Sequence, residues 1–271
     1  IASYDEFHYQ QVINCLNSGK HVYVEKPICL KKKDLQKINE KLKKYPDLKI
    51  SSNMVLRTCP LFIKVRDEVL SNKMGDIYHL EADYLYGRKE KITSGWRAQA
   101  DFYSIIHGAA VHMIDLVIWI TGKRPVSVKA LGNNIAVSGT KQKHNDFAIL
   151  LLEFENQMSV KISAHGGVVH PHFHTLKIFG KKSSFIHEFT NTFWLDSSNP
   201  NQKFRAETAS YPEKDVRGQA LISFVDALAK PHIIGPFSFP TALAILLTAL
   251  KSPGLAKGNP ASITSTPNLA N

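Results

Sequence analysis

The chain has 271 residues, of which 44% are hydrophobic and 21% charged, enough for one large domain or two modest ones. Its longest apolar stretch, near residues 241–250, is too short to span a bilayer, and no signal-peptide pattern opens the sequence. Three cysteines without metal-ligand spacing argue against a disulfide framework. We therefore expect a cytoplasmic protein with no membrane partner.

The formal net charge of +11 raises the question of nucleic-acid binding. Many of the lysines fall within residues 31–44, interleaved with Leu35, Ile38 and Leu42, which recur at helical spacing. This pattern predicts an amphipathic helix with a solvated charged face, and no known nucleic-acid module accompanies it. We expect no nucleic-acid partner, although a basic surface also favours anionic substrates or a phosphate-bearing cofactor.

Helix and strand patterns alternate through the first 55 residues. Apolar residues recur at helical spacing over residues 1–18, and Gly19 is placed to end that helix. The elements expected next are a strand over 21–24, a helix over 33–45 and a strand over 48–54. Such alternation is typical of a parallel, doubly wound α/β sheet. Because it begins in mid-pattern, we interpret residues 1–55 as the second half of an α/β domain.

The regular alternation of helix and strand patterns ends after residue 55. The elements expected there are helices over 60–72 and 105–122, strands over 75–87, 126–136, 146–166, 173–189 and 192–198, and closing helices over 217–229 and from Pro240. Turns at 155–157 and Gly180 separate strands that follow one another directly, which predicts a mostly antiparallel open sheet with helices on one face. The tail 252–271 is expected to be mobile.

Glu25, Lys26 and Pro27 directly follow the strand predicted over 21–24. Ligands of a doubly wound sheet bind at the carboxyl ends of its strands, so these residues occupy the rim where a substrate binds. A lysine in such a crevice can hydrogen-bond a substrate hydroxyl, and partial desolvation lowers its pKa into a useful range. The alternative is a Glu–Lys pair that only decorates the end of a strand.

The helix predicted over 105–122 carries His107 and His112, separated by small residues that permit close approach of a ligand or another backbone. Asp115 follows His112 on a neighbouring helical face and is expected to orient its imidazole. The alternative is that both histidines are core residues of an otherwise apolar helix.

The stretch 170-HPHFH-174 places three histidines at alternating positions. A strand projects alternate residues to one side, so His170, His172 and His174 are candidate zinc ligands of a hydrolase. Alternate residues of a strand are spread by about 6–7 Å, however, which suits a chelate poorly. We therefore expect no metal and favour a strand that lines a substrate cleft.

The order of the motifs resembles one known family. The segments 19-GKHVYVEKP-27 and 112-HMIDLVIWITG-122 are similar to the glucose–fructose oxidoreductase / inositol dehydrogenase (Gfo/Idh/MocA) family. The resemblance extends from residue 1 to about 262. It implies the C-terminal half of a Rossmann domain that binds NAD or NADP over residues 1–55. It further implies a substrate and oligomerisation domain with an open, mainly antiparallel sheet over 56–271.

The resemblance also implies an activity and a set of site residues. Family members transfer a hydride at a carbinol carbon of sugars, cyclitols or nucleotide sugars, and a homo-oligomer (dimer or tetramer) is expected. Lys26 becomes the lysine at the reacting hydroxyl and His112 the proton acceptor, helped by His107, with Tyr103 also at the substrate. The residues expected around the cofactor are Ser3, Tyr4, His8, Glu25, Lys26, Pro27, Asn53, Trp96 and Arg97.

The sequence departs from the family pattern at two places. In the family's D-x-x-x-H motif an aspartate precedes the histidine by four residues, but that position is Gly108. Either His107 substitutes for it or the site uses a different proton relay. No G-x-G-x-x-G turn, which brings the cofactor's pyrophosphate to a helix N-terminus, occurs in the 271 residues. We expect an NAD(P)-dependent oxidoreductase of a polyhydroxylated small molecule, whose phosphate-binding segment precedes Ile1. The alternative is a non-catalytic binding or scaffold protein of the same fold.

Overall fold

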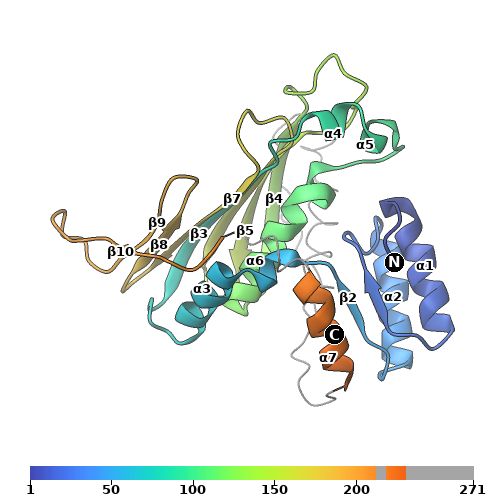
Figure 1. Cartoon of the computed structure of the whole chain (residues 1–271), viewed down its shortest axis with the longest axis horizontal. Helices are drawn as coiled ribbons and strands as arrows, with labels where there is room; N and C mark the ends of the chain where they lie inside the picture. The colour runs from blue at the N-terminus through green and yellow to red at the C-terminus, as the bar shows by residue number, and fades with distance from the viewer. Residues whose placement is uncertain (212–217, 230–271) are drawn as a thin grey trace.

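A small parallel sheet with two helices forms the first part of the chain (Figure 1). The computed structural model describes residues 1–211 and 218–229. The first elements are α1 (Asp5–Asn17), β1 (Val22–Val24), α2 (Lys32–Lys44) and β2 (Ile50–Ser52). β1 and β2 pair in parallel, with Val22 opposite Ile50, which confirms the predicted alternation of helix and strand.

Both of these helices are amphipathic in the way that the sequence predicts. α1 buries Val12 and Leu16, and the chain turns at Gly19, whose φ of +66° lies in the left-handed region that favours glycine. α2 buries Leu35 and Ile38, while most of its lysines are exposed. The basic run is therefore the solvated face of a helix.

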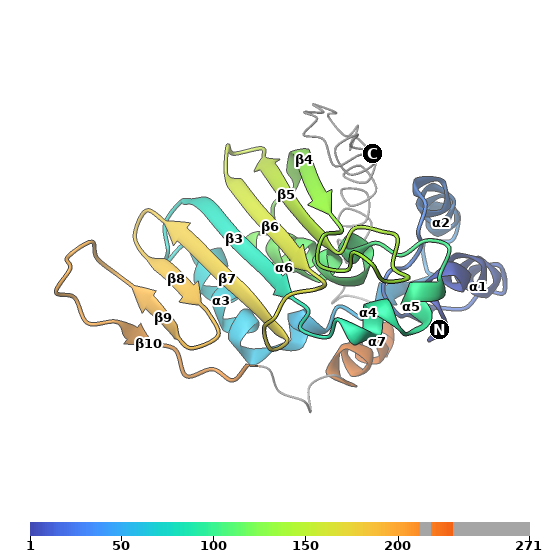
Figure 2. The same ribbon diagram turned by 90° about the horizontal axis from the view of Figure 1, so that it is seen from above.

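The remaining described strands form one eight-stranded sheet (Figure 2). They are β3 (Ile77–Leu85), β4 (Pro125–Asn133), β5 (Phe147–Phe154), β6 (Ser159–His165), β7 (Phe173–Gly180), β8 (Ser184–His187), β9 (Thr192–Leu195) and β10 (Arg205–Ala206). Their order across the sheet is β10-β9-β8-β7-β3-β6-β5-β4. Every neighbouring pair is antiparallel except β3 and β6, which pair in parallel. The predicted open, mainly antiparallel sheet is confirmed.

Helices pack against one face of this sheet. The described helices after β2 are η1 (Val55–Thr58), α3 (Pro60–Leu70), α4 (Glu90–Thr93), α5 (Trp96–Gln99), η2 (Ile106–Ala110), α6 (Val111–Thr121) and α7 (Gln219–Ala229). α3 and α6 lie side by side on the same face (Figures 1 and 2). Pro60 occupies the first turn of α3, where a helix needs no N–H, and Gly122 ends α6 with a φ of +64°.

Some local features go beyond the sequence prediction. The helix predicted over 105–122 begins as a π-helical turn, η2, before α6 continues it. The four-residue helices α4 and α5 were not predicted, because such short segments carry no periodic pattern. The helix predicted from Pro240 and the tail 252–271 lie outside the described residues. Among the described residues, no helix combines the length and apolarity needed to cross a membrane.

Candidate active site

Lys26 lies directly after β1, and its side chain reaches the π-helical turn η2. Its Nζ donates a hydrogen bond of 2.7 Å to the carbonyl oxygen of Gly108. Burial lowers the pKa of Lys26, whereas the carboxylates of Asp5 and Glu25 act in the opposite direction. The Arg97 guanidinium adds to the lowering. The strand-end position predicted from the sequence is confirmed, and the ammonium joins residues that are far apart in the chain.

His8 contacts the backbone at Ser3 and at Pro27, the residue that follows Lys26. Its ring is fully buried on α1, with the carbonyl oxygen of Pro27 2.7 Å from Nδ1 and that of Ser3 3.1 Å from Nε2. The Ser3 hydroxyl in turn donates to Gln11 on the same helix at 2.8 Å. Since His8 is enclosed, it ties the loop at Ser3 and the turn at Pro27 to α1.

Asn53 and Glu25 form a short polar chain at the ends of β1 and β2. The Asn53 side-chain amide donates to Glu25 Oε1 at 2.7 Å, and the Tyr23 hydroxyl donates to Asn53 Oδ1 at 2.9 Å. Burial and the nearby Glu25 carboxylate raise the pKa of Tyr23 to about 12. Tyr23 therefore keeps its proton, and this chain holds Glu25 beside Lys26.

An open pocket of about 530 Å³ lies next to Lys26. Its wall contains most of the residues predicted for the cofactor, together with Asp5 and Phe7, which the sequence did not single out. The lining residues are Ala2, Ser3, Tyr4, Asp5, Phe7, Glu25, Lys26, Trp96 and Arg97.

Aromatic stacking closes this pocket on one side. The rings of Tyr4 and Trp96 stack with centroids 4.8 Å apart, and the Arg97 guanidinium lies 4.5 Å from the Trp96 ring. Burial raises the pKa of Asp5, although Lys26, His8 and Arg97 oppose this shift. The pocket thus combines flat aromatic faces with two cationic side chains, Lys26 and Arg97, and two carboxyl groups, Asp5 and Glu25.

His107 lies in η2, enclosed by apolar groups. Neither ring nitrogen has a hydrogen-bond partner within the described part of the chain, and the Phe102 ring meets the imidazole edge-on at 5.5 Å. Burial, reinforced by the Lys26 charge, lowers the pKa of His107 to about 3. The ring is therefore neutral at physiological pH, and its catalytic role stays a prediction.

His112 faces the sheet rather than the side chain that was expected to orient it. Its ring stacks on Tyr84 of β3 at 5.8 Å, and Nδ1 has no hydrogen-bond partner within the described residues. Burial lowers the pKa of His112 well below its usual range, with smaller effects from Lys26 and His172.

The predicted contact between Asp115 and His112 is wrong. Arg57 of η1 donates to both carboxylate oxygens of Asp115, at 2.7 and 2.6 Å. Asp115 is almost fully buried, so it takes the nearest cation, which comes from a distant part of the sequence.

The three histidines of the HPHFH stretch do not converge. His170 bonds the carbonyl of Pro171, the ring of His172 bonds the carbonyl oxygen of Tyr86, and His174 bonds the Tyr211 hydroxyl. No group of three potential metal ligands is found over residues 1–211 and 218–229. The zinc hydrolase considered from the sequence is not supported by this geometry.

Two of these histidines instead surround the tyrosine that stacks on His112. The rings of His172 and His174 meet Tyr84 edge-on, at 5.3 and 4.4 Å. Tyr84 and this arrangement were missed at the level of the sequence, because Tyr84 belongs to an ordinary alternating strand. The alternation of β3 marks only which face Tyr84 is on.

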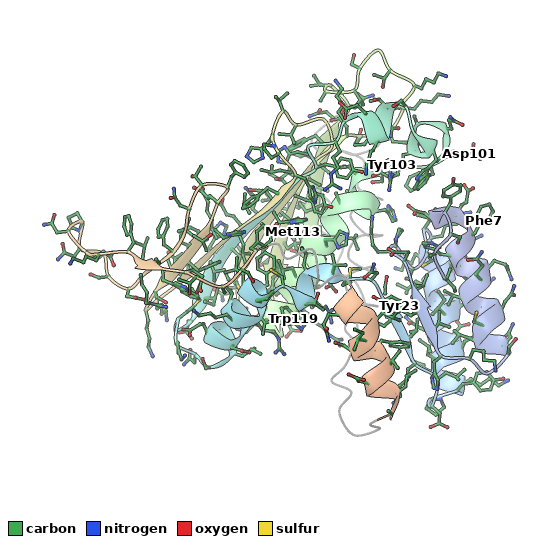
Figure 3. The ribbon with its side chains drawn as sticks, in the orientation of Figure 1. Phe7, Tyr23, Asp101, Tyr103, Met113 and Trp119 are labelled. Carbon is green, nitrogen blue, oxygen red and sulfur yellow. The ribbon has the colours of Figure 1, made fainter. Side chains whose placement is uncertain are left out.

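Tyr103 lies beside the start of η2, toward the same end of the molecule as Phe7 of α1 (Figure 3). It is buried, and its ring meets Trp96 edge-on at 6.3 Å and lies 5.7 Å from the Arg97 guanidinium. Lys26, through its bond to Gly108, and Tyr103, through its contacts with Trp96 and Arg97, thus connect η2 to residues that line the open pocket.

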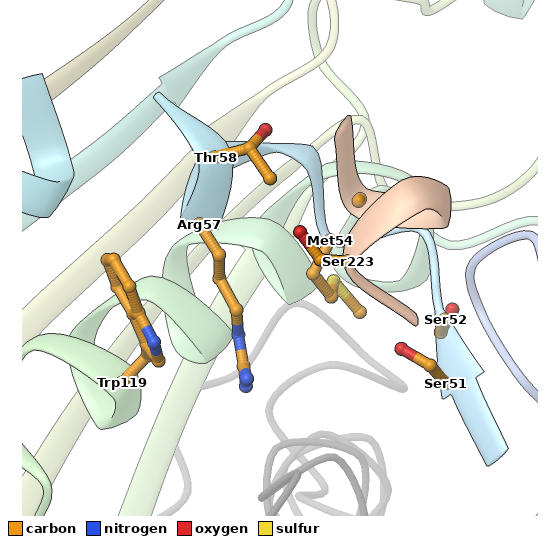
Figure 4. Close-up of a pocket in the computed structure, with 8 residues that line it drawn as sticks. Ser51, Ser52, Met54, Arg57, Thr58, Trp119 and Ser223 are labelled. Atoms are coloured by element: carbon orange, nitrogen blue, oxygen red, sulfur yellow. The ribbon is translucent and has the colours of Figure 1, made fainter. Parts of the chain in front are cut away.

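A second pocket, of about 200 Å³, lies between β2, η1, α6 and α7 (Figure 4). The residues that line it are Ser51, Ser52, Met54, Arg57, Thr58, Trp119, Ala220 and Ser223. None of the residues predicted for catalysis or cofactor binding belongs to it.

Comparison with known proteins gives two matching family models. The model described as "Oxidoreductase family, NAD-binding Rossmann fold" matches residues 1–51. The model described as "GFO/IDH/MocA C-terminal domain" matches residues 62–186. An uncharacterised oxidoreductase of Synechocystis sp. is 25% identical over 201 residues, which cover 69% of this chain and 53% of that protein. The chain therefore spans about half the length of that curated relative.

Solved structures share the fold at low identity. An oxidoreductase domain protein from Kribbella flavida has a TM-score of 0.78 and 19% identity, covering 90% of this chain and 75% of that one. A scyllo-inositol dehydrogenase from Lactobacillus casei, solved with bound NAD(H) and scyllo-inositol, has a TM-score of 0.68 and 21% identity. That match covers 91% of this chain and 76% of the other. Two matching family models and the shared fold show that the chain belongs to the Gfo/Idh/MocA oxidoreductase family.

Proposed function

We propose that the chain takes part in NAD(P)-dependent hydride transfer at the carbinol or carbonyl carbon of a small polyhydroxylated molecule. The observation that carries this proposal is the position of Lys26. One ammonium group both lines the open pocket and acts electrostatically on His107 and His112. The scyllo-inositol dehydrogenase of Lactobacillus casei supports a sugar or cyclitol as the class of substrate.

The side chains of this site divide the work of alcohol oxidation. Lys26 donates a hydrogen bond to the reacting oxygen and stabilises the negative charge that develops on it. His112 is neutral because burial lowers its pKa, so its imidazole can accept the hydroxyl proton. The hydride leaves the carbinol carbon with the electron pair of its C–H bond, and a C=O double bond forms. In the reverse direction His112 returns the proton.

The wall of the open pocket fits the nicotinamide end of NAD or NADP. Tyr4 and Trp96 offer aromatic faces, while Arg97 and Lys26 offer cationic donors for ribose or phosphate oxygens. When bound, the nicotinamide supplies the hydride acceptor or donor. A G-x-G-x-x-G turn is not among the 271 residues, so these side chains account for the nicotinamide end of the cofactor.

The test uses three carriers: NAD, NADP and nicotinamide mononucleotide, which lacks the adenosine half of the cofactor. The oxidised carriers are combined with a panel of cyclitols and sugars and the reduced carriers with the corresponding ketones, and the absorbance of reduced nicotinamide is followed. We expect hydride transfer with at least one combination. Absence of transfer with every combination, together with absence of binding by calorimetry, contradicts the proposal.

A binding role without chemistry is the second candidate function. Gly108, which stands where the family motif has a carboxylate, favours it. The nitrogens of His107, which have no hydrogen-bond partner among the described residues, favour it too. A protein of this kind binds a cyclitol in the calorimeter and transfers no hydride to or from any of the three carriers. The same experiment therefore separates the two candidates.

We also propose that the open face of the large sheet pairs with a second copy of the chain. Leu131 of β4 and Leu151 of β5 are 44% and 53% exposed on neighbouring strands, which supports an apolar contact. Light scattering on the wild-type chain and on Leu151→Glu tests this. The wild type is expected to be a dimer or tetramer, and a monomeric wild type overturns the idea.

A further inference from the structure

The ring of Tyr103 packs against the backbone of Gly108 in η2. A Cβ added to Gly108 would overlap the Tyr103 hydroxyl and would lie 2.7 Å from Cζ and 3.1 Å from Cε2 of that ring. Real Cβ atoms essentially never approach another heavy atom so closely. The glycine and the tyrosine therefore depend on each other: the phenol fills the space that a side chain at position 108 would take.

The Tyr103 side chain is almost fully buried, at 3% exposed. Its hydroxyl makes no hydrogen bond to another group of the described chain, yet it is not among the polar atoms there that are both enclosed and unpaired. The hydroxyl oxygen therefore keeps access to its surroundings, and its proton is available to a bound ligand.

Tyr103 lies between Gly108 and two residues that line the open pocket. The same Gly108 accepts the hydrogen bond of Lys26 Nζ through its carbonyl oxygen. On its other side the Tyr103 ring meets Trp96 and Arg97, both of which line the open pocket. The hydroxyl is thus held between the anchor of Lys26 and the pocket wall.

We propose that Tyr103 is a further catalytic residue, whose hydroxyl donates a hydrogen bond to the reacting oxygen of the substrate alongside Lys26. This inference rests on the proposed hydride transfer. It also accounts for the departure from D-x-x-x-H, because the space beside Gly108 holds a hydroxyl group where the motif has a carboxylate.

A neutral phenol is suited to this role. Burial raises the pKa of Tyr103, so the group keeps its proton over the physiological range and acts as a donor. As the substrate oxygen gains negative charge in the transition state, the hydrogen bond from Tyr103 strengthens. The substrate proton passes to His112, and Tyr103 keeps its own proton throughout.

The test uses three variants of the chain and one matched control. Tyr103→Phe removes the hydroxyl alone, and Gly108→Ala displaces it by filling its space. The double variant Tyr103→Phe/Gly108→Ala completes a thermodynamic cycle. Tyr78→Phe makes the same chemical change at an exposed tyrosine of β3. Turnover of the polyol that responds in the panel, affinity for that polyol by calorimetry, and the melting temperature are measured for each.

We expect Tyr103→Phe and Gly108→Ala each to lower turnover about a hundredfold, the usual effect of removing one donor to a developing oxyanion. Polyol affinity falls less, by about tenfold at most. The double variant is expected to be no worse than either single one, because the hydroxyl can be lost only once. Tyr78→Phe leaves turnover unchanged.

Two results overturn this inference while leaving the proposed function intact. One is a Tyr103→Phe variant that turns over like an active wild type, and the other is strictly additive losses in the double variant. A wild-type chain that neither binds a polyol nor transfers hydride overturns both the proposed function and the role of Tyr103.

Discussion

The two walls of the candidate site differ in charge and in burial. The wall built on the start of α1 and the end of β1 carries the ionisable residues Asp5, Glu25 and Lys26 beside an open pocket. The wall built on η2 and α6 carries His107 and His112, both buried and held neutral by that burial. In the first wall opposite charges lie close together, so the carboxylates of Asp5 and Glu25 oppose the lowering of the Lys26 pKa by burial. In the second wall burial and the Lys26 charge both lower the histidine pKa values, so both imidazoles stay neutral.

The ion pair between Arg57 and Asp115 joins the wall built on η2 and α6 to η1, and breaking it has the largest expected effect. Arg57→Ala leaves the Asp115 carboxylate buried without its bidentate partner. We expect the free energy of unfolding to fall by about 3–5 kcal/mol in urea denaturation.

A matched control for this variant is Arg205→Ala, which removes a two-pronged pair with Asp196 whose side chains are both about half exposed. That change is expected to lower stability by less than about 1 kcal/mol. Equal losses of unfolding free energy in Arg57→Ala and Arg205→Ala would show that burial does not make the Arg57–Asp115 pair more important for stability than an exposed pair.

Removing the amino group of Lys26 is expected to have the next largest effect. Lys26→Ala takes away the ammonium that stabilises the reacting oxygen, so turnover falls at least about a hundredfold while the circular dichroism spectrum is unchanged. Lys37→Ala, an exposed lysine of α2, serves as the control. Near-normal turnover of Lys26→Ala rejects its catalytic role.

Because His107, in the wall built on η2 and α6, is buried in its neutral form, we expect the stability of the fold to depend on pH. The pKa of His107 is about 3 when folded and about 6.5 when unfolded, so below about pH 6.5 the unfolded chain binds more protons. Stability is therefore full above about pH 6.5 and is lost as the pH falls toward 3.

Replacing this histidine isolates its share of the pH dependence. In His107→Leu, the slope of unfolding free energy against pH in acid is expected to be smaller by about 1.4 kcal/mol per pH unit. Urea titrations at a series of pH values measure it. A slope identical to that of the wild type would mean that His107 is not held neutral by its surroundings.

The smallest effect concerns the end of α6, remote from either wall. Gly122 adopts a φ of +64°, and a Cβ there would only touch Leu70 at an ordinary distance of 3.7 Å. Gly122→Ala is therefore expected to lower stability by about 1 kcal/mol through backbone strain alone. Thermal denaturation measures this, with turnover unchanged. A loss of turnover would show that the wall built on η2 and α6 senses the far end of its helix.

The sequence predicted the parts of this molecule that depend on local patterns. The amphipathic spacing in α1 and α2, and the break of a strand at Lys26, follow from residues close together in the chain. Contacts between distant segments were not predictable in the same way. Asp115 was assigned to His112 because they are neighbours on one helix, whereas its partner Arg57 comes from η1.

The site shows the same limit of local patterns. The position of Tyr84 beside His112 depends on how β3 is placed in the sheet, which no single segment encodes. The pairing of Tyr103 with Gly108 depends on a π-helical turn that interrupts a regular helical pattern. Such turns arise where tertiary packing overrides local preference, so they carry no periodic signal of their own.

The parallel pairing of β3 with β6 has a consequence for the order of folding. His79 pairs with Ser159 and Leu85 with His165, while the other edge of β3 pairs with β7, which is later still in the chain. During synthesis, β3 therefore has no sheet neighbour until the ribosome has passed β6. Pairings of such long range are slow to form. We therefore expect the strand that carries Tyr84 to His112 to pair late in folding, after the shorter-range pairing of β1 with β2 beside Lys26.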